Sequence, residues 1–349
     1  MKSCRRRGRP GFSEPLLQRR SQVSRSSLFS RLKPDGFTMA LVATVIVASL
    51  LPCRGQGAVI FGAITDVAIG LLFFLHGAKL SREAIIAGAG HWRLHLLVLA
   101  STFVMFPLLG LGVTALPASV LNPQVALGVL YLCILPSTVQ SSIAFTSMAG
   151  GNVPAAVCAA SASNLLGIFL TPALAALLLG LHGAGAGGDF FSAVQAIVIQ
   201  LLLPFVAGHL LRPWIGGFVD RHKKALTLVD RGSILLVVYT AFSAAVIEGL
   251  WRRLGVADLA AIVVIDIVIL AIALFATTFA ARRLGFSRVD EITVVFCGSK
   301  KSLASGVPMA GVLFSAAAVG PVLLPLMVFH QIQLMVCAVL ARRYAEKAG

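Results

Sequence analysis

The chain has 349 residues, of which 58% are hydrophobic and only 12% are charged, and its formal net charge is +16. A soluble domain carries about 25% charged residues, so this composition excludes an ordinary soluble protein and indicates an all-α polytopic membrane protein. The positive charge lies in a tail and in short gaps between apolar segments. This pattern is typical of membrane topology and argues against nucleic acid as a partner.

Residues 1–33 form a basic tail that is rich in Arg and Ser, and ten of the 29 Lys and Arg residues precede Phe37. A segment of this kind buries too little apolar surface to offset the entropy of ordering, so we expect it to be disordered. A start codon assigned too far upstream is an alternative explanation for the tail. A cleaved signal sequence around Arg19 and Arg20, or ending at Cys53, is a third interpretation.

Ten apolar segments follow the tail. A helix needs about 17–25 residues to cross a hydrocarbon core of about 30 Å, and most of these segments are that long. We predict ten transmembrane helices within one domain over residues 34–345, at 37–52, 58–77, 94–115, 124–148, 152–179, 190–211, 231–250, 256–280, 290–315 and 319–340.

The Lys and Arg residues are distributed unequally between the two sides of the membrane that these segments define. The tail, the gaps after the second, sixth and eighth segments, and the C-terminus hold nearly all of them, whereas the opposite side holds Arg54, Arg252 and Arg253. Because positive charge accumulates on the cytoplasmic side, we predict that both termini are cytoplasmic. We expect the protein to lie in the lipid bilayer of the plasma (bacterial inner) membrane.

The two halves of the domain, residues 34–182 and 189–345, have the same organisation. Each has five segments, and the fourth segment of each is interrupted by polar, Gly or Pro residues. An odd number of segments per half makes the two repeats inverted in the membrane. Paired interruptions of this kind indicate a transporter binding site, because freed backbone groups are tolerated only inside the protein or beside a wet cavity.

The first interruption follows Pro136 and contains five candidate substrate- or ion-binding residues: Ser137, Thr138, Gln140, Ser141 and Ser142. Their side chains can cap freed helix ends, and they can also bind a cation or a carboxylate. Contacts between helices through small polar residues are the alternative. Asn164, about 18 Å along the next helix from Asn152, is a further candidate with the same alternative.

The second interruption contains Ser299, Lys300 and Lys301. A lysine at the bilayer centre costs about 2.5–3.5 kcal/mol, so we expect at least one of the two to have a functional role. The alternative is that both lie near the cytoplasmic end of a segment that begins with charged residues. Asp266 lies in an apolar segment and needs a partner, for which Lys300 or Lys301 is the candidate.

Known catalytic and nucleotide-binding motifs are missing from the sequence. It contains no G-x-x-x-x-G-K-[ST] and no H-E-x-x-H, and its six cysteines form no C-x-x-C pair. We therefore expect no cofactor, no metal site and no enzyme activity. An intramembrane protease that uses Asp66 and Asp266 is a disfavoured alternative, because these residues lie in opposite halves of the chain.

Four segments of the chain, 135–142, 150–152, 164–172 and 296–304, resemble the bile acid:sodium symporter family. They are most similar to a branch that includes bacterial symporters and a eukaryotic member linked to control of calcium uptake. The resemblance covers roughly residues 34–340 and implies two inverted five-helix repeats. It also implies that helices 4 and 9 are broken and cross near the bilayer centre, and that a panel domain moves against a core domain.

The sodium-coupled relatives bind two ions beside this crossing, and this sequence differs from them at the ligands. Ala156 and Ala160 replace a Ser and a Thr, and Phe296, Lys300 and Lys301 replace a Glu, a Gln and an Asn. Hard cations prefer oxygen ligands, so we do not expect the sodium sites to be retained. A lysine can instead replace a bound cation or hold an anionic substrate.

The resemblance therefore predicts a secondary active transporter for a small organic anion, with sodium and the proton as open candidates for the coupling ion. The alternative is a non-transporting membrane regulator of calcium uptake.

Overall fold

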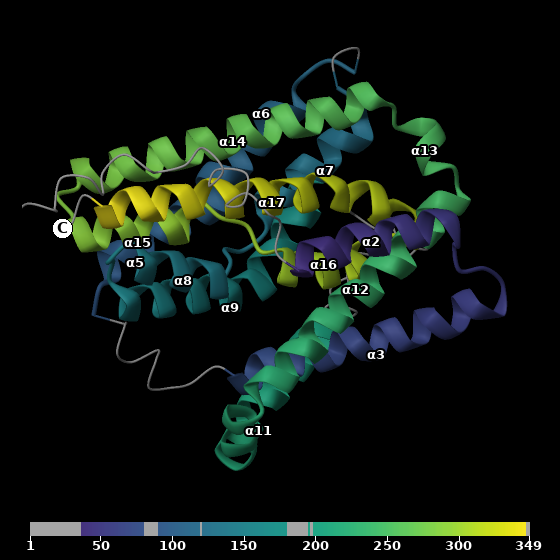
Figure 1. Cartoon of the computed structure of the whole chain (residues 1–349), viewed down its shortest axis with the longest axis horizontal. Coiled ribbons are helices and arrows are strands. Elements are labelled where there is room, and N and C mark those ends of the chain that lie inside the picture. Colours follow the sequence, from purple (N-terminus) through teal and green to yellow (C-terminus); the bar gives the residue numbers. More distant parts are fainter. Residues whose placement is uncertain (1–35, 80–89, 119–120, 180–194, 196–197, 347–349) are drawn as a thin grey trace, which may run out of the picture. The chain divides into compact units, whose positions relative to one another are not determined.

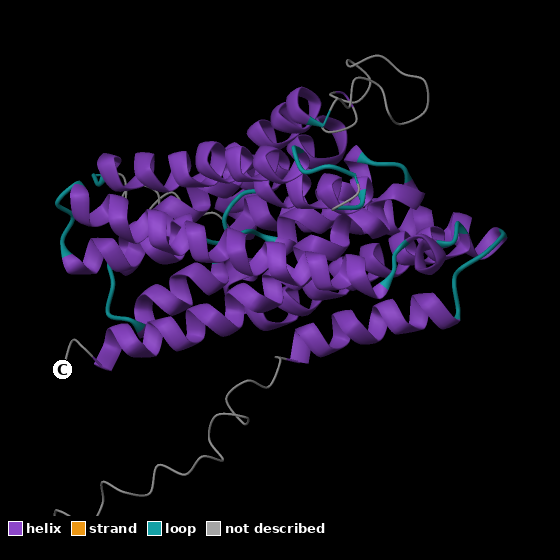
Figure 2. Cartoon of the chain, turned by 90° about the horizontal axis from the view of Figure 1, so that it is seen from above, coloured by secondary structure: helices purple, strands orange, loops and turns teal. Residues whose placement is uncertain are grey.

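The computed structural model describes residues 36–79, 90–118, 121–179, 195 and 198–346. Within these ranges every regular element is a helix, and Figure 2 shows only helices and loops. The predicted tail at 1–33 and the Gly-rich stretch at 183–188 lie outside the described residues. The chain from Gly36 onward forms one compact unit.

The first half of this unit contains the following helices, with η1 a π-helical stretch: α2 (Gly36–Leu50), α3 (Gln56–Lys79), α5 (Trp92–Ala100), η1 (Ser101–Met105), α6 (Phe106–Thr114), α7 (Pro123–Ile134), α8 (Gln140–Met148) and α9 (Val153–Leu178). The second half contains η2 (Val198–Leu202), α11 (Leu203–Arg221), α12 (Lys223–Ile247), α13 (Leu250–Arg253), α14 (Val256–Arg283), α15 (Arg288–Gly298), α16 (Leu303–Leu313) and α17 (Ala316–Glu346).

Within the described residues, seven helices are long and apolar enough to cross a membrane, with α5, η1 and α6 counted as one helix and η2 and α11 as another. Helix α2 and the interrupted pairs α7/α8 and α15/α16 coincide with the three other predicted segments. The expected all-helical, multi-pass architecture is therefore confirmed. The count of ten spans and the inverted symmetry remain predictions.

The charged gap predicted between the sixth and seventh segments is mostly helical. Helix α11 continues to Arg221 and α12 begins at Lys223, so only His222 separates them. Apolar residues mark only the part of a helix that lies in hydrocarbon. The helix itself continues further because it keeps its backbone groups paired, and this extension is not visible in hydropathy.

Asparagine followed closely by proline begins two of the helices. The side chain of Asn122 accepts a hydrogen bond from the amide of Gln124 at the start of α7, and Asn152 accepts one from Ala155 at the start of α9. An N-cap side chain satisfies an amide that has no partner within the helix, and proline in the first turn needs no such partner.

Helices α3 and α11 lie side by side and touch through their backbones (Figure 1). A Cβ atom added at Gly77 would overlap the carbonyl oxygen of Phe205, and one added at Gly208 would overlap the carbonyl oxygen of Phe74. Small residues allow transmembrane helices to approach this closely. The contact therefore requires glycine at both positions.

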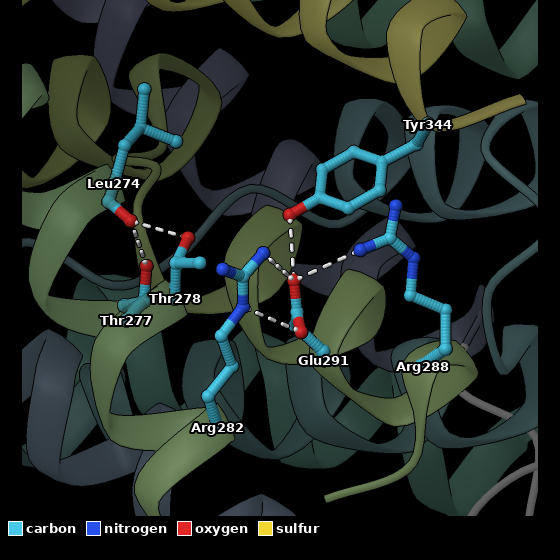
Figure 3. Close-up of polar contacts among 7 residues, drawn as sticks. All are labelled: Leu274, Thr277, Thr278, Arg282, Arg288, Glu291 and Tyr344. Carbon is cyan, nitrogen blue, oxygen red and sulfur yellow. Dashed lines mark hydrogen bonds and ion pairs between the residues drawn. The ribbon is translucent and has the colours of Figure 1, made fainter. Parts of the chain in front are cut away.

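Glu291 joins the ends of three helices (Figure 3). Its carboxylate accepts two hydrogen bonds of 3.0 Å from Arg282 on α14, one of 3.5 Å from Arg288 on α15, and one of 3.1 Å from the Tyr344 hydroxyl on α17. The Glu291 side chain is 7% exposed, whereas that of Arg282 is 61% exposed. This cluster fixes the first turn of α15 against its neighbours.

We expect Glu291→Gln to lower the stability of the protein by about 1–2 kcal/mol. Hydrogen bonds to charged groups contribute about 1.5–3 kcal/mol, but the exposure of the arginines weakens their share. The apparent midpoint of thermal unfolding in detergent, measured at one scan rate, tests this expectation. Glu346→Gln, at an exposed position on α17, is the matched control, and equal midpoints for the two variants would contradict the structural role of Glu291.

Candidate substrate site at two broken helices

The first interruption lies between α7 and α8. Helix α7 ends at Ile134, and the next residue, Leu135, is extended, with ψ of 156°. The residue before a proline is driven away from the helical region, so Pro136 explains this end, as predicted. The chain becomes helical again at Gln140, where α8 begins without a side-chain cap.

The second interruption lies between α15 and α16 and touches the first. Helix α15 ends at Gly298, and α16 begins at Leu303 after Ser302, whose side chain accepts from the amide of Ser305. The amide of Ser302 donates to the carbonyl of Pro136 at 2.9 Å. The two interruptions therefore meet, as the sequence predicts, and Lys300 and Lys301 lie where they meet.

Side chains from neighbouring helices satisfy the carbonyls that the first interruption leaves free. Thr171 on α9 donates to Ile134 at 2.9 Å. Asn164, also on α9, donates to Ser137 at 2.6 Å and accepts from the Ser305 hydroxyl at 2.7 Å. Asn164 thus connects both broken helices. These contacts match the alternative stated from the sequence, in which Asn164 holds neighbouring helices together.

Hydroxyl groups satisfy the carbonyls at the end of α15. Ser142 donates to Phe296 at 2.9 Å, Ser137 to Cys297 at 2.5 Å, and Ser101 to Gly298 at 2.7 Å. Ser299 donates to Val295 within its own helix at 2.6 Å. Ser137, Ser142 and Ser299 are buried and use their protons on the backbone. A ligand would therefore meet only their oxygen lone pairs.

Lys301 is fully buried, and its ammonium group is surrounded by backbone oxygens. The nitrogen donates to the carbonyls of Thr102, Cys133 and Leu135 at 2.8, 2.7 and 2.7 Å. An ammonium group has three protons, so all three are paired. Two of these carbonyls belong to the C-terminal end of α7, where the helix dipole favours a positive charge.

The third carbonyl, that of Thr102, has no amide donor within its own helix because of a proline. In the π-helical stretch η1, the amide of Phe106 donates to Ser101, five residues earlier. The same spacing would pair residue 107 with Thr102, but residue 107 is proline and has no N–H. The Thr102 carbonyl is therefore available to the Lys301 ammonium.

Lys300 is also fully buried but has far fewer partners. Its one hydrogen bond goes to the Ser141 hydroxyl and is long, at 3.5 Å. The Phe145 and Phe296 ring centres lie 4.5 and 5.7 Å from its nitrogen. Among the described residues, two of its three protons have no oxygen acceptor. The adjacent lysines thus face different surroundings, although both are buried within the protein.

The other candidates of the first interruption lie beside Lys300 at the start of α8. Ser141 donates to Thr138 at 2.8 Å, and Thr138 shares a hydrogen bond of 3.0 Å with Ser142. Gln140 is exposed and lies outside this network. The uncapped start of α8 carries partial positive charge, so Lys300 and α8 present two positive groups to the same place.

The expected ion pair of Asp266 with a lysine is wrong for the conformation described. Asp266 is fully buried on α14, and neither of its carboxyl oxygens has a hydrogen-bond partner among the described residues. Lys301 has already used all its protons on carbonyls. The structure thus shows no ion pair between Asp266 and either lysine among the described residues, where the sequence had suggested one.

Sequence reasoning missed two residues that position Lys301. The Gln333 side chain on α17 pairs with both the amide and the carbonyl of Lys301, each at 2.9 Å. Thr102 contributes only its backbone. Two glutamines close together in an apolar segment, Gln331 and Gln333, are a signal that could have identified Gln333, whereas Thr102 could be inferred only from the register of Pro107.

An all-helical, multi-pass protein in which two interrupted helices meet has the architecture of a secondary transporter. The model of the SBF-like CPA transporter family matches residues 35–346, and the chain belongs to this family. The resemblance to bile acid:sodium symporters stated from the sequence is thereby confirmed.

Three relatives illustrate the similarity. The uncharacterized protein PA2026 of Pseudomonas aeruginosa is 64% identical over 317 residues, which cover 91% of this chain and 95% of the relative. The protein named "Putative symporter YfeH" of Escherichia coli is 60% identical over 313 residues, 90% of this chain and 93% of its own length. "Sodium/bile acid cotransporter 7-B" of Xenopus laevis is 26% identical over 322 residues, 90% and 92% of the two chains.

Proposed function

We propose that this transporter moves a small organic anion across the plasma membrane, and that the Lys301 ammonium takes the place of a bound sodium ion. The observation that carries the proposal is the pair of fully buried ammonium groups where the two broken helices meet. All three protons of Lys301 have carbonyl acceptors, whereas Lys300 has one long hydrogen bond among the described residues. The names of two relatives, a symporter and a sodium/bile acid cotransporter, support a solute as the cargo.

Lys301 has the surroundings of a bound cation. Three backbone oxygens converge on its nitrogen, as oxygens converge on a hard metal ion. A second positive charge about 4 Å away would be repelled by about 4 kcal/mol at an effective dielectric constant near 20. A sodium ion beside Lys301 would therefore bind weakly.

The positions that carry sodium ligands in the resembling family supply no side-chain oxygen here. Ala156, Ala160 and Phe296 are fully buried. The Phe296 ring packs against Phe145 and Tyr344, with ring centres 5.9 and 6.1 Å apart. This aromatic packing occupies the space of a carboxylate side chain, and it supports the view that sodium coupling is lost.

Lys300 is the group that we assign to the anion. A buried ammonium with incomplete partners is unfavourable, and a bound carboxylate would complete its hydrogen bonds. The first amides of α8 lie beside it, and the start of a helix favours an anion. Ser141, which contacts Lys300, would be the hydroxyl next to the bound carboxylate. We also propose that both termini of the chain lie on the cytoplasmic side of the membrane.

We expect Lys300→Gln to reduce anion uptake into liposomes at least tenfold, which corresponds to about 1.4 kcal/mol. The probes are labelled taurocholate and labelled benzoate, a large and a small carboxylate or sulfonate anion. Lys224→Gln, at an exposed position on α12, is the matched control. A folded native protein that moves neither probe in a saturable way would contradict the proposal and favour a non-transporting regulator.

A further inference from the structure

Asp266 is a buried carboxyl group that the proposed anion site does not use. It lies in the middle of α14 and is 0% exposed, and neither of its oxygens has a hydrogen-bond partner in the described part of the chain. The ion pairs between described residues involve the other carboxylates Asp220, Asp230 and Glu291. Asp266 thus lies in a helix long and apolar enough to cross a membrane, with no countercharge in direct contact among the described residues.

An ionised carboxylate in these surroundings is very unfavourable, because it has lost its water without gaining a partner. A neutral carboxylic acid occupies the same position at far lower cost. The packing of Asp266 is therefore compatible with a bound proton and incompatible with a stable negative charge in this conformation.

On the helices that pack against α14, none of the described side chains pairs with the Asp266 carboxyl group. Helix α14 packs against η1, α6, α7, α15 and α17, and η1 and α6 carry no titratable side chain. On α7, the Tyr131 hydroxyl donates to the carbonyl of Gly306 at 2.6 Å. The other titratable side chain of α7, the Cys133 thiol, is buried.

The remaining charged or titratable side chains lie on α15 and α17. They are Arg288, Asp290, Glu291 and Cys297 on α15, and His330, Cys337, Arg342, Arg343, Tyr344 and Glu346 on α17. Arg282, which pairs with Glu291, lies about 24 Å along α14 from Asp266. The His330 ring shares a hydrogen bond with Gln333. Lys301 donates to the carbonyl of Cys133 at 2.7 Å, and among the described residues no ion pair joins it to Asp266.

We propose that Asp266 is a proton-binding site, and that the proton it carries moves in the same cycle as the anion. In the conformation described, the carboxyl group is protonated. When the protein opens toward water, the O–H bond breaks, the proton passes to a water molecule, and a carboxylate remains on Asp266. The coupling rests on the proposed transport function, whereas proton binding by Asp266 does not.

Infrared spectroscopy of the full chain in liposomes tests proton binding without any substrate. We expect the spectrum at neutral pH to contain the C=O stretch of a protonated carboxyl group, and Asp266→Asn to remove it. Asp266→Glu should keep a shifted band, and Asp220→Asn, at an exposed position on α11, should leave the band unchanged. An identical carboxyl band in the native chain and Asp266→Asn would overturn the proposal.

Transport of taurocholate and benzoate tests the coupling. With acid outside the liposomes, net uptake by the native chain should rise at least fivefold over uptake without a pH gradient. Asp266→Asn should lose this response but still exchange labelled for unlabelled anion, because it mimics the protonated state. If Asp266→Asn responds to the gradient like the native chain, the coupling is refuted while anion transport stands. If no variant moves either anion, the proposed function fails, and the infrared result still decides whether Asp266 binds a proton.

Discussion

Lys301→Met should destabilise the protein by at least about 2 kcal/mol, far more than the same change at Lys300. Methionine leaves the carbonyls of Thr102, Cys133 and Leu135 without their shared donor. Each buried acceptor that loses its partner costs about 1–3 kcal/mol. The loss of a charge that had to be removed from water offsets part of this cost, and the remainder should still lower the apparent unfolding midpoint by several degrees.

Lys300→Met is the matched control, because the Lys300 ammonium has only one hydrogen bond to the described part of the chain, of 3.5 Å, to Ser141. We expect its stability to change by less than about 1 kcal/mol, since a long hydrogen bond contributes little and the apolar side chain fits between Phe145 and Phe296. Apparent midpoints of thermal unfolding in detergent compare the two variants. Equal losses for both would show that the Lys301 cage does not stabilise the fold.

Gly208→Ala should prevent α3 and α11 from packing and greatly reduce the yield of folded protein. The added methyl group would overlap the carbonyl oxygen of Phe74, and a backbone atom cannot move aside as a side chain can. Overpacking typically costs about 1–3 kcal/mol, and we expect a loss at or above the top of this range. Gly77→Ala, which meets the Phe205 carbonyl from the opposite helix, should have the same effect.

Gly217→Ala on the same helix provides the control, because nothing lies within 4 Å of a Cβ atom there. Replacing an exposed helical glycine by alanine favours the helix by up to about 1 kcal/mol, so this variant should be as stable as the native chain or slightly more so. Size-exclusion chromatography of the detergent-extracted protein measures the folded fraction. A monodisperse peak of native height for Gly208→Ala would contradict the close contact of the two backbones.

Much of the fold could be predicted because hydropathy and proline act locally. The apolar segments predict where helices lie, and Pro136 predicts where α7 ends. Helix ends outside the hydrocarbon could not be predicted in this way, as the continuation of α11 to Arg221 shows. The close approach of Gly77 and Gly208 depends on two helices about 130 residues apart in the sequence, and neither glycine alone indicates it.

The location of the site was easier to predict than the partners of its residues. Two lysines in an apolar segment are costly wherever they lie, so their importance was visible. Their partners were not, because the three acceptors of Lys301 are backbone carbonyls, which every residue has. The same limit applies to Asp266: charge alone suggested Lys300 or Lys301 as its partner, but the protons of Lys301 are already donated to three backbone carbonyls.

The dependence of anion binding on sodium tests most directly the claim that Lys301 replaces a bound cation. Taurocholate and benzoate binding to the purified chain is measured through ligand-induced stabilisation, with equal concentrations of sodium or choline chloride. We predict apparent affinities for the native chain that agree within about twofold in the two salts, and no gain from sodium in Lys300→Gln. Binding that appears only in sodium would contradict the claim, because the ammonium of Lys301 would then fail to substitute for the ion.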